Sequence, residues 1–256
     1  MKPVVIAYLG KGGSGKSILS SLTAKLAIEA NLRTLLIDAD PAMGLATALD
    51  ATGFKTIGRA RDEIIHQARI SKGDESARLS EIIDYLLLEA LHETERYSMM
   101  VMGQTSTVGC YCPVNNLLRE TIGAIADNYD VVVIDAEAGI EQINREVTRS
   151  VHYPILLTDN SLRGAKTTLL ARDTIVNSPG MRPEKVGVIF NRVEEPGAPL
   201  VALLKENGLN LYGVIPADPV VTDRDMRGES ALTIPHSAPS LQALAAILTA
   251  QGILPL

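Results

Sequence analysis

The chain has 256 residues, of which 46% are hydrophobic and 21% charged, and its formal net charge is −6. This composition is typical of a globular protein that can bury one sizeable core. The acidic balance disfavours general binding to nucleic acid, and no run of 18 or more apolar residues predicts a membrane span. Because the first apolar run is too short for a signal peptide, we expect a cytoplasmic protein whose two cysteines form no structural disulfide.

Short apolar runs alternate with longer helical patterns along the chain. The predicted strands cover residues 4–9, 34–37, 98–102, 131–134, 155–158, 186–190 and 211–215. The predicted helices cover residues 16–30, 80–95, 115–127, 164–177, 199–207 and 240–250. This alternation predicts one α/β domain over residues 1–256, a three-layer sandwich with a mostly parallel central sheet. Residues 52–72 are the least regular, and we expect an insertion or a mobile loop there.

A glycine-rich segment, GKGGSGKS, begins at Gly10 and separates the first predicted strand from the first helix. It matches the P-loop pattern G-x-x-x-x-G-K-[ST] in the strand–helix context that the motif requires. Glycines let backbone N–H groups turn around phosphate oxygens, and the helix N-terminus favours negative charge. The residues expected to contact the nucleotide here are Gly10, Gly12, Gly13, Ser14, Gly15, Lys16, Ser17 and Ile18. Lys16 should reach the β- and γ-phosphates, and Ser17 should bind Mg²⁺.

Lys11 directly follows the first glycine of the loop. A second lysine at this position marks the deviant Walker A motif, so the chain resembles the MinD/ParA/NifH-like class of P-loop ATPases. In that class the extra lysine reaches the nucleotide of the partner subunit. The resemblance therefore implies a homodimer that depends on nucleotide, with Lys11 acting across its interface. A solvated loop lysine is the alternative.

Three aspartates end predicted strands at the edge where ligands bind in such sheets. Asp38 and Asp40 match the D-x-D-P pattern of the resembled class, and one can orient the attacking water while the other lies on the Mg²⁺ side. We assign water to Asp40 and the metal to Asp38, an assignment that can be exchanged. Asp135 ends the run VVVID, a Walker B pattern, and should bind Mg²⁺ through water. Gly139, four residues on, matches the switch II glycine of the class.

The base should be held by residues in the last third of the chain. Asn191 follows the predicted strand 186–190, where the resembled class has an asparagine that contacts the base, and Arg192 is next to it. Pro216 lies in a stretch that resembles the later base-side loop of the class. Glu194 occupies a position where guanine-specific switches carry an aspartate, which leaves GTP open. By resemblance, ATP and ADP are the expected nucleotides.

Cys110 and Cys112 form a C-x-C pair before the predicted helix 115–127. Together with its neighbours, the pair closely resembles the nickel-insertion ATPases that mature carbon monoxide dehydrogenase, the CooC type. Two thiolates suit Zn²⁺ or Ni²⁺, and a tetrahedral site could be completed by the same pair from a second chain. The resemblance implies a maturation factor whose client is carbon monoxide dehydrogenase or acetyl-CoA synthase. Two buried structural cysteines are the alternative.

Two other functions fit the same motifs. One is a ParA/MinD-like partitioning or positioning ATPase, which would bind DNA or membrane when it holds ATP. The acidic balance and the absence of a basic C-terminal helix disfavour that function. The other is an Fe–S redox protein of the NifH-like type, although the close spacing of the two cysteines differs from the spacing in that type. The four histidines show no metal-ligand spacing and are assigned no site.

Overall fold

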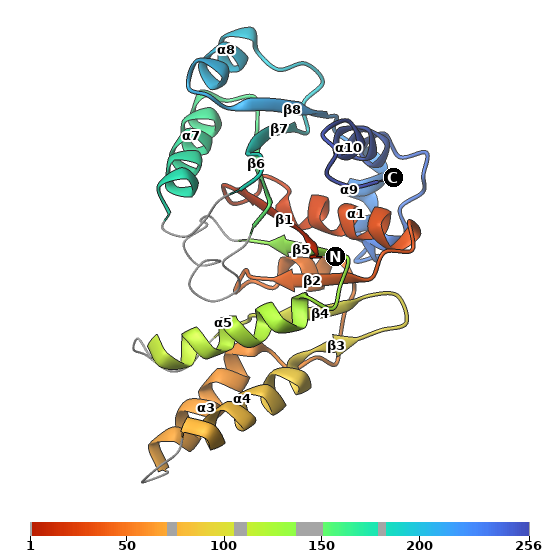
Figure 1. The fold of residues 1–256 in the computed structure, drawn as a ribbon. Helices are drawn as coiled ribbons and strands as arrows, with labels where there is room; N and C mark the ends of the chain where they lie inside the picture. Colours follow the sequence, from red (N-terminus) through yellow and green to blue (C-terminus); the bar gives the residue numbers. More distant parts are fainter. Residues whose placement is uncertain (1, 71–75, 105–111, 137–150, 179–182, 256) are drawn as a thin grey trace.

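The computed structural model describes residues 2–70, 76–104, 112–136, 151–178 and 183–255. Eight strands form one sheet in the order β3-β4-β2-β5-β1-β6-β7-β8 (Figure 1). The strands are β1 (Val4–Gly10), β2 (Thr34–Asp38), β3 (His92–Glu93), β4 (Ser98–Val101), β5 (Val131–Asp135), β6 (Tyr153–Thr158), β7 (Gly187–Asn191) and β8 (Asn210–Ile215). Neighbouring strands are parallel except for β3, which is antiparallel to β4. The sheet therefore collects the carboxyl ends of seven strands at one edge, where ligands bind in such folds.

Helices cover both faces of this sheet. In Figure 1, α1 (Lys16–Glu29), α9 (Pro219–Met226) and α10 (Pro239–Ala250) lie on one side, and α7 (Leu162–Asn177) lies on the other. The remaining helices are α2 (Gly44–Ala48), α3 (Ile57–Ile70), α4 (Ser76–Ala90), α5 (Cys112–Ala126), α8 (Ala198–Glu206) and a 3₁₀ turn over Ala231–Thr233. The predicted three-layer α/β architecture with a mostly parallel sheet is confirmed.

Side chains of β1 alternate between two apolar cores. Ile6 and Tyr8 belong to the core that packs against α1 and α10, whereas Ala7 and Leu9 belong to the core on the opposite face. All four are fully buried, as expected for a central strand covered on both sides. The strand that precedes the glycine loop is thus packed against apolar side chains on both of its faces.

The expectation of an irregular insertion over residues 52–72 is wrong for most of that segment. Helix α3 runs from Ile57 to Ile70 and packs against α4 and α5. Its buried residues Ile57, Ala60 and Ile64 are spaced for one helical face, and they join the core beneath the sheet. Charged residues between them lower the mean hydropathy and hide the pattern, and packing against two other helices stabilises the helix.

Four further elements differ from the expected ones. Helix α4 ends at Ala90, and part of the predicted helix 80–95 is the short strand β3, which pairs with β4 through His92 and Met99. The short helix α2 and helix α9 were not predicted. Within the described ranges, no helix is both long and apolar enough to cross a bilayer.

Candidate functional site

The loop between β1 and α1 has the backbone geometry of an anion cradle. Gly10 and Gly15 have φ values of 154° and 92°, which side chains with a Cβ rarely adopt. Space is lacking as well, because a Cβ on Gly15 would lie 2.3 Å from Nδ2 of Asn191, and one on Gly10 would lie 2.7 Å from the carbonyl oxygen of Leu157. The bare backbone of this loop, placed at the N-terminus of α1, can surround phosphate oxygens.

Lys16 is buried inside this loop, although it is the first residue of α1. Its Nζ donates hydrogen bonds to the carbonyl oxygens of Gly10 at 3.1 Å and of Lys11 at 3.3 Å. The hydroxyl of Ser14 is buried without a hydrogen-bond partner among the described residues. An ammonium held by loop carbonyls and an unpaired hydroxyl beside it suit the negatively charged oxygens of a phosphate.

Asp135, at the end of β5, is fully buried, and neither of its carboxylate oxygens has a hydrogen-bond partner in the part of the chain that is described. Burial raises the pKa of this carboxyl to about 7; the nearby Ser17 hydroxyl and Lys16 oppose the shift, and Asp38 adds to it. Gly44 of α2 lies close to both Ser17 and Asp135, since a Cβ on Gly44 would be 2.5 Å from Ser17 Oγ and 3.8 Å from Asp135 Oδ2.

A buried acid without a partner beside a serine hydroxyl fits a divalent cation. Ser17 and Asp135 are therefore the residues that would hold Mg²⁺. Within the described ranges, no group of three or more His, Cys, Asp or Glu side chains is placed to hold a metal by itself.

Asp38 and Asp40 are brought to the same edge, but their carboxylates have different surroundings. Asp38 is fully buried, and its two oxygens accept hydrogen bonds from the backbone N–H groups of Asp40 at 3.2 Å and Ala46 at 2.9 Å. Burial raises the pKa of Asp38 to about 6, although these N–H groups favour the charged form. Asp40 is partly exposed and accepts a hydrogen bond from the N–H of Ala42 at 2.9 Å.

Lys11 forms an ion pair within its own chain. Its ammonium contacts Asp159, a residue that directly follows β6 and that sequence reasoning missed. Asp159 also accepts a hydrogen bond from Ser161, the N-cap of α7, at 2.5 Å. Desolvation of Asp159 is outweighed by the hydrogen bonds from Lys11 and Ser161, which hold its pKa below the usual range. The available signal was an aspartate directly after predicted strand 155–158.

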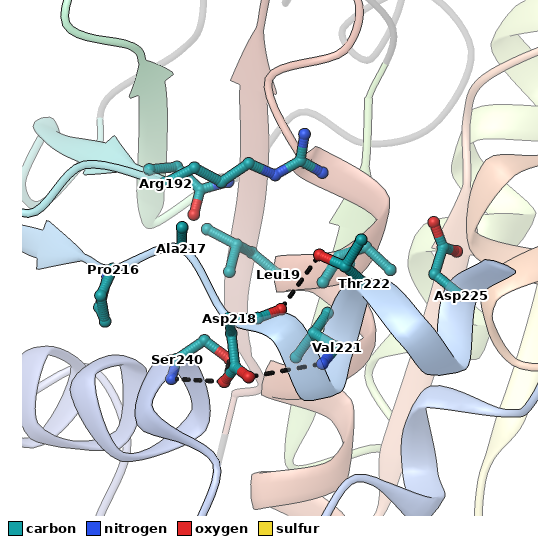
Figure 2. Close-up of a pocket in the computed structure, with 11 residues that line it drawn as sticks. Leu19, Arg192, Pro216, Ala217, Asp218, Val221, Thr222, Asp225 and Ser240 are labelled. Atoms are coloured by element: carbon teal, nitrogen blue, oxygen red, sulfur yellow. Dashed lines mark hydrogen bonds between the residues drawn. The ribbon is translucent and has the colours of Figure 1, made fainter.

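A cavity of about 260 Å³ opens beside the cradle (Figure 2). The predicted base-side residues Asn191, Arg192 and Pro216 all line it, and so does Ile18, which was expected to contact the nucleotide next to the glycine loop. Ala217 and Asp218, which follow Pro216 in the predicted base-side stretch 213–218, line it as well. Sequence reasoning did not assign the remaining lining residues, Leu19, Val221, Thr222, Asp225 and Ser240. Glu194, the residue for which GTP was kept as an alternative nucleotide, is exposed and is not among the lining residues.

Two residues fix the shape of this cavity. The side-chain amide of Asn191 donates a hydrogen bond to the carbonyl oxygen of Ser14 at 2.8 Å, so it ties β7 to the cradle. Asp218 is buried, and it caps α9 through the N–H groups of Val220 at 3.0 Å and Val221 at 3.4 Å. It also joins α10 through Ser240; Figure 2 shows the contacts of Asp218 with Val221 and Ser240. Arg192 has a left-handed backbone, with φ 60°, and its side chain lies along the cavity.

Two predicted features fall outside the described residues. Cys110 and the switch II glycine Gly139 lie in the ranges 105–111 and 137–150. Cys112 is the first residue of α5, and its side chain is not described. The proposed thiolate site is therefore neither supported nor contradicted by the geometry.

The cradle and the cavity lie next to each other, because Asn191, which lines the cavity, donates a hydrogen bond to Ser14 of the cradle. A cradle for phosphates next to a cavity for a base is the arrangement of a mononucleotide-binding site. The molecule is therefore a P-loop nucleotide-binding protein. More particularly, the chain belongs to the CobQ/CobB/MinD/ParA nucleotide binding domain family, whose model matches residues 5–231.

Individual relatives agree with this family. An uncharacterised ATP-binding protein of Methanocaldococcus jannaschii is 34% identical over 238 residues, which cover 91% of this chain and 92% of the relative. The carbon monoxide dehydrogenase accessory protein CooC of Rhodospirillum rubrum is 27% identical over 241 residues, which cover 88% of each chain. Among solved structures, the MinD protein of Pyrococcus horikoshii with Mg-ADP superimposes with a TM-score of 0.68 at 18% identity, over 99% of this chain and 100% of that one.

Proposed function

We propose that this protein is a Mg²⁺-dependent ATPase that acts as a molecular switch. The carboxylate of Asp135 beside Ser17 carries the proposal. It is buried and accepts no hydrogen bond from the described residues, and a cation that arrives with the nucleotide would explain a buried acid in this position. Mg²⁺ would supply charge neutralisation between the β- and γ-phosphates. Lys16 would exchange its bonds to the loop carbonyls for bonds to phosphate oxygens.

Hydrolysis requires a water positioned in line with the γ-phosphate. We assign this role to Asp40, whose carboxylate is partly exposed at the same edge as the cradle. The water oxygen forms a bond to the γ-phosphorus while the bond from phosphorus to the β–γ bridging oxygen breaks. The products are ADP and inorganic phosphate, and the proton of the water leaves to the solvent or to the phosphate. A slow intrinsic turnover is expected for such a switch.

The orientation of the Asn191 amide supports ATP over GTP. Its nitrogen donates to Ser14, which leaves the amide oxygen available as an acceptor for a base. An acceptor suits the 6-amino group of adenine and not the 6-oxygen of guanine. The position of Glu194 outside the cavity supports the same choice.

Two further parts of the proposal rest on the family resemblance. Lys11 would leave Asp159 and contact the nucleotide of a second copy, which couples dimer formation to ATP. Cys110 and Cys112 would then bind Zn²⁺ or Ni²⁺ together with the same pair of the second copy. The likeness to the CooC accessory protein supports a role in supplying nickel to carbon monoxide dehydrogenase or acetyl-CoA synthase.

Anaerobic size-exclusion chromatography with metal analysis tests this proposal. Protein without nucleotide, with Mg-ADP and with a slowly hydrolysed Mg-ATP analogue should differ in elution, with one metal per dimer in the ATP-like state. The double variant Cys110→Ser, Cys112→Ser should bind nucleotide but no Zn²⁺ or Ni²⁺. Metal bound equally well without the two thiols would refute the metal role and leave the ATPase role standing.

A partitioning or positioning role has weaker support. The similarity to MinD and ParA structures is below 20% identity and concerns the fold. Sedimentation with DNA or anionic liposomes, with and without ATP, separates the two functions. Binding of either only in the ATP state would favour the partitioning role.

A further inference from the structure

A second cavity, of about 440 Å³, lies at the edge of the sheet opposite to the nucleotide site. It is lined by Val5 near the start of β1, by Ala126 at the end of α5 and by His152 directly before β6, all of which lie near the amino ends of strands. The glycine loop instead follows the carboxyl end of β1, and that strand rises roughly 20 Å from its first residue to its last. The two cavities share no lining residue and are separate.

Part of the lining of the second cavity is apolar and buried, namely Pro3, Val5 and Ala126. Gly123 of α5 lines the cavity as well, and a Cβ on it would meet no atom of the described residues within 4 Å. Glycine inside a helix is less favourable than alanine, and here neither close packing nor a left-handed backbone requires it. The missing side chain keeps the cavity open.

Two polar side chains of the lining, Arg119 and His152, are half-buried. The N–H of Val5 donates a hydrogen bond to Nδ1 of His152 at 3.0 Å, which fixes the ring. In the neutral ring the proton is therefore on Nε2, so this nitrogen is a donor. The guanidinium of Arg119 has five N–H donors and no acceptor. Both side chains thus suit a carboxylate.

The charged side chains of the lining balance each other. Lys2 and Arg119 are positive and Glu120 and Asp127 are negative, so their formal charges sum to zero while His152 is neutral. Glu120 and Asp127 are exposed, and carboxylates in such a position suit an ammonium group. A balanced set of charges complements a ligand that carries both signs, and it gives little advantage to a polyanion such as a second nucleotide.

We infer that the second cavity binds a free amino acid with an apolar side chain. Arg119 and His152 bind its carboxylate, and Glu120 or Asp127 binds its ammonium group. The side chain of the ligand lies against the apolar part of the lining, in the space that Gly123 leaves open. The cavity volume is in the range usual for small-molecule sites. This binding function is additional to the proposed ATPase function and does not depend on it.

Isothermal titration calorimetry of the full chain with L-leucine tests the ligand class. Leucine should bind saturably, one molecule per chain, whether or not Mg-ADP is present. 4-Methylpentanoate lacks the ammonium group of leucine, and 3-methylbutylamine lacks its carboxylate. Each should bind about tenfold or more weakly than leucine, because charge-assisted hydrogen bonds are lost. An absence of saturable leucine binding, or an analogue that binds as tightly as leucine, overturns the inference.

The variant Gly123→Leu tests the location. The added side chain fills the open space beside α5 and is a good helix former, so leucine binding should be lost while the affinity for Mg-ADP stays unchanged. Ala202→Leu is the matched control, since Ala202 is an exposed residue of α8 outside the lining. Equal leucine binding in the two variants overturns the location.

Two further measurements cover the case in which Gly123→Leu does not fold. Arg119→Gln should weaken leucine binding about tenfold or more and leave the affinity for 3-methylbutylamine unchanged. In the unaltered chain, which has four histidines, leucine should shift the ring resonances of His152 in NMR spectra, and Mg-ADP should not. Full leucine affinity in Arg119→Gln, or an unshifted His152 ring, overturns the inference. Wild-type protein that binds leucine but no nucleotide would defeat the proposed function alone.

Discussion

Two buried aspartates at opposite ends of the nucleotide cleft have contrasting surroundings. Asp218, at the base end, accepts hydrogen bonds from the N–H groups of Val220, Val221 and Ser240 and from the Ser240 hydroxyl. Asp135, at the phosphate end, accepts none from the described residues. Desolvation of Asp218 is outweighed by its hydrogen bonds, which lower its pKa, whereas burial raises the pKa of Asp135. A buried carboxylate that accepts hydrogen bonds from the protein stabilises the fold, whereas one that accepts none from the described residues is suited to bind a cation.

The largest effect is expected from Lys16→Ala at the phosphate end. The loss of two or more charge-assisted hydrogen bonds to phosphate should weaken Mg-ADP binding about 100-fold or more, as measured by isothermal titration calorimetry. Lys185→Ala is the control, because Lys185 is exposed and contacts the carbonyl oxygen of Gln251. Equal affinity in the two variants would contradict the cradle.

Asparagine substitution of the two aspartates should change the stability of the unliganded protein in opposite directions. Asp218→Asn breaks a satisfied network, so the free energy of unfolding should fall by about 1–3 kcal/mol and Tm by about 3–9 °C. Asp135→Asn removes a buried charge that accepts no hydrogen bond from the described residues, so Tm should rise at pH 8. Thermal unfolding monitored by circular dichroism gives both values, and a fall in both variants would erase the contrast.

The unliganded protein should lose stability as pH rises from 5 to 8. The pKa values of Asp38 and Asp135 are about 6 and about 7 in the folded state, compared with 3.8 for an unperturbed aspartate. A raised folded-state pKa stabilises the protein fully at acidic pH, and that contribution disappears as pH passes through 6–7. Urea unfolding at several pH values measures the slope. Mg-ADP should reduce the slope, and in Asp135→Asn the slope should be shallower than in wild type.

The smallest effect is expected for Asp159→Asn. The side chains of Lys11 and Asp159 are 33% and 42% exposed, and ion pairs of this kind contribute about 0–1 kcal/mol. Tm should therefore change by less than about 4 °C, in contrast to Asp218→Asn. A larger fall would mean that the pair maintains the fold in the same way as Asp218.

Local patterns predicted the phosphate end of the site more completely than the base end. The glycine loop and Asp135 could be identified because a strand, a tight turn and a helix are encoded by consecutive residues. The contacts of Asp159 with Lys11 and of Asp218 with Ser240 join residues that are distant in sequence, so only the folded chain brings them together. Helix α3 was missed for a related reason, since its stability comes from packing against α4 and α5.

The bond from Asn191 to Ser14 joins residues that are 177 positions apart in sequence. During synthesis the amino-terminal half emerges with its glycine loop and lysine, but without β7 and the walls of the cavity. A nascent chain should therefore be unable to retain ATP until its last third has folded onto the first. Nucleotide capture then reports that the whole chain has assembled, and a fragment ending before β7 should not bind it.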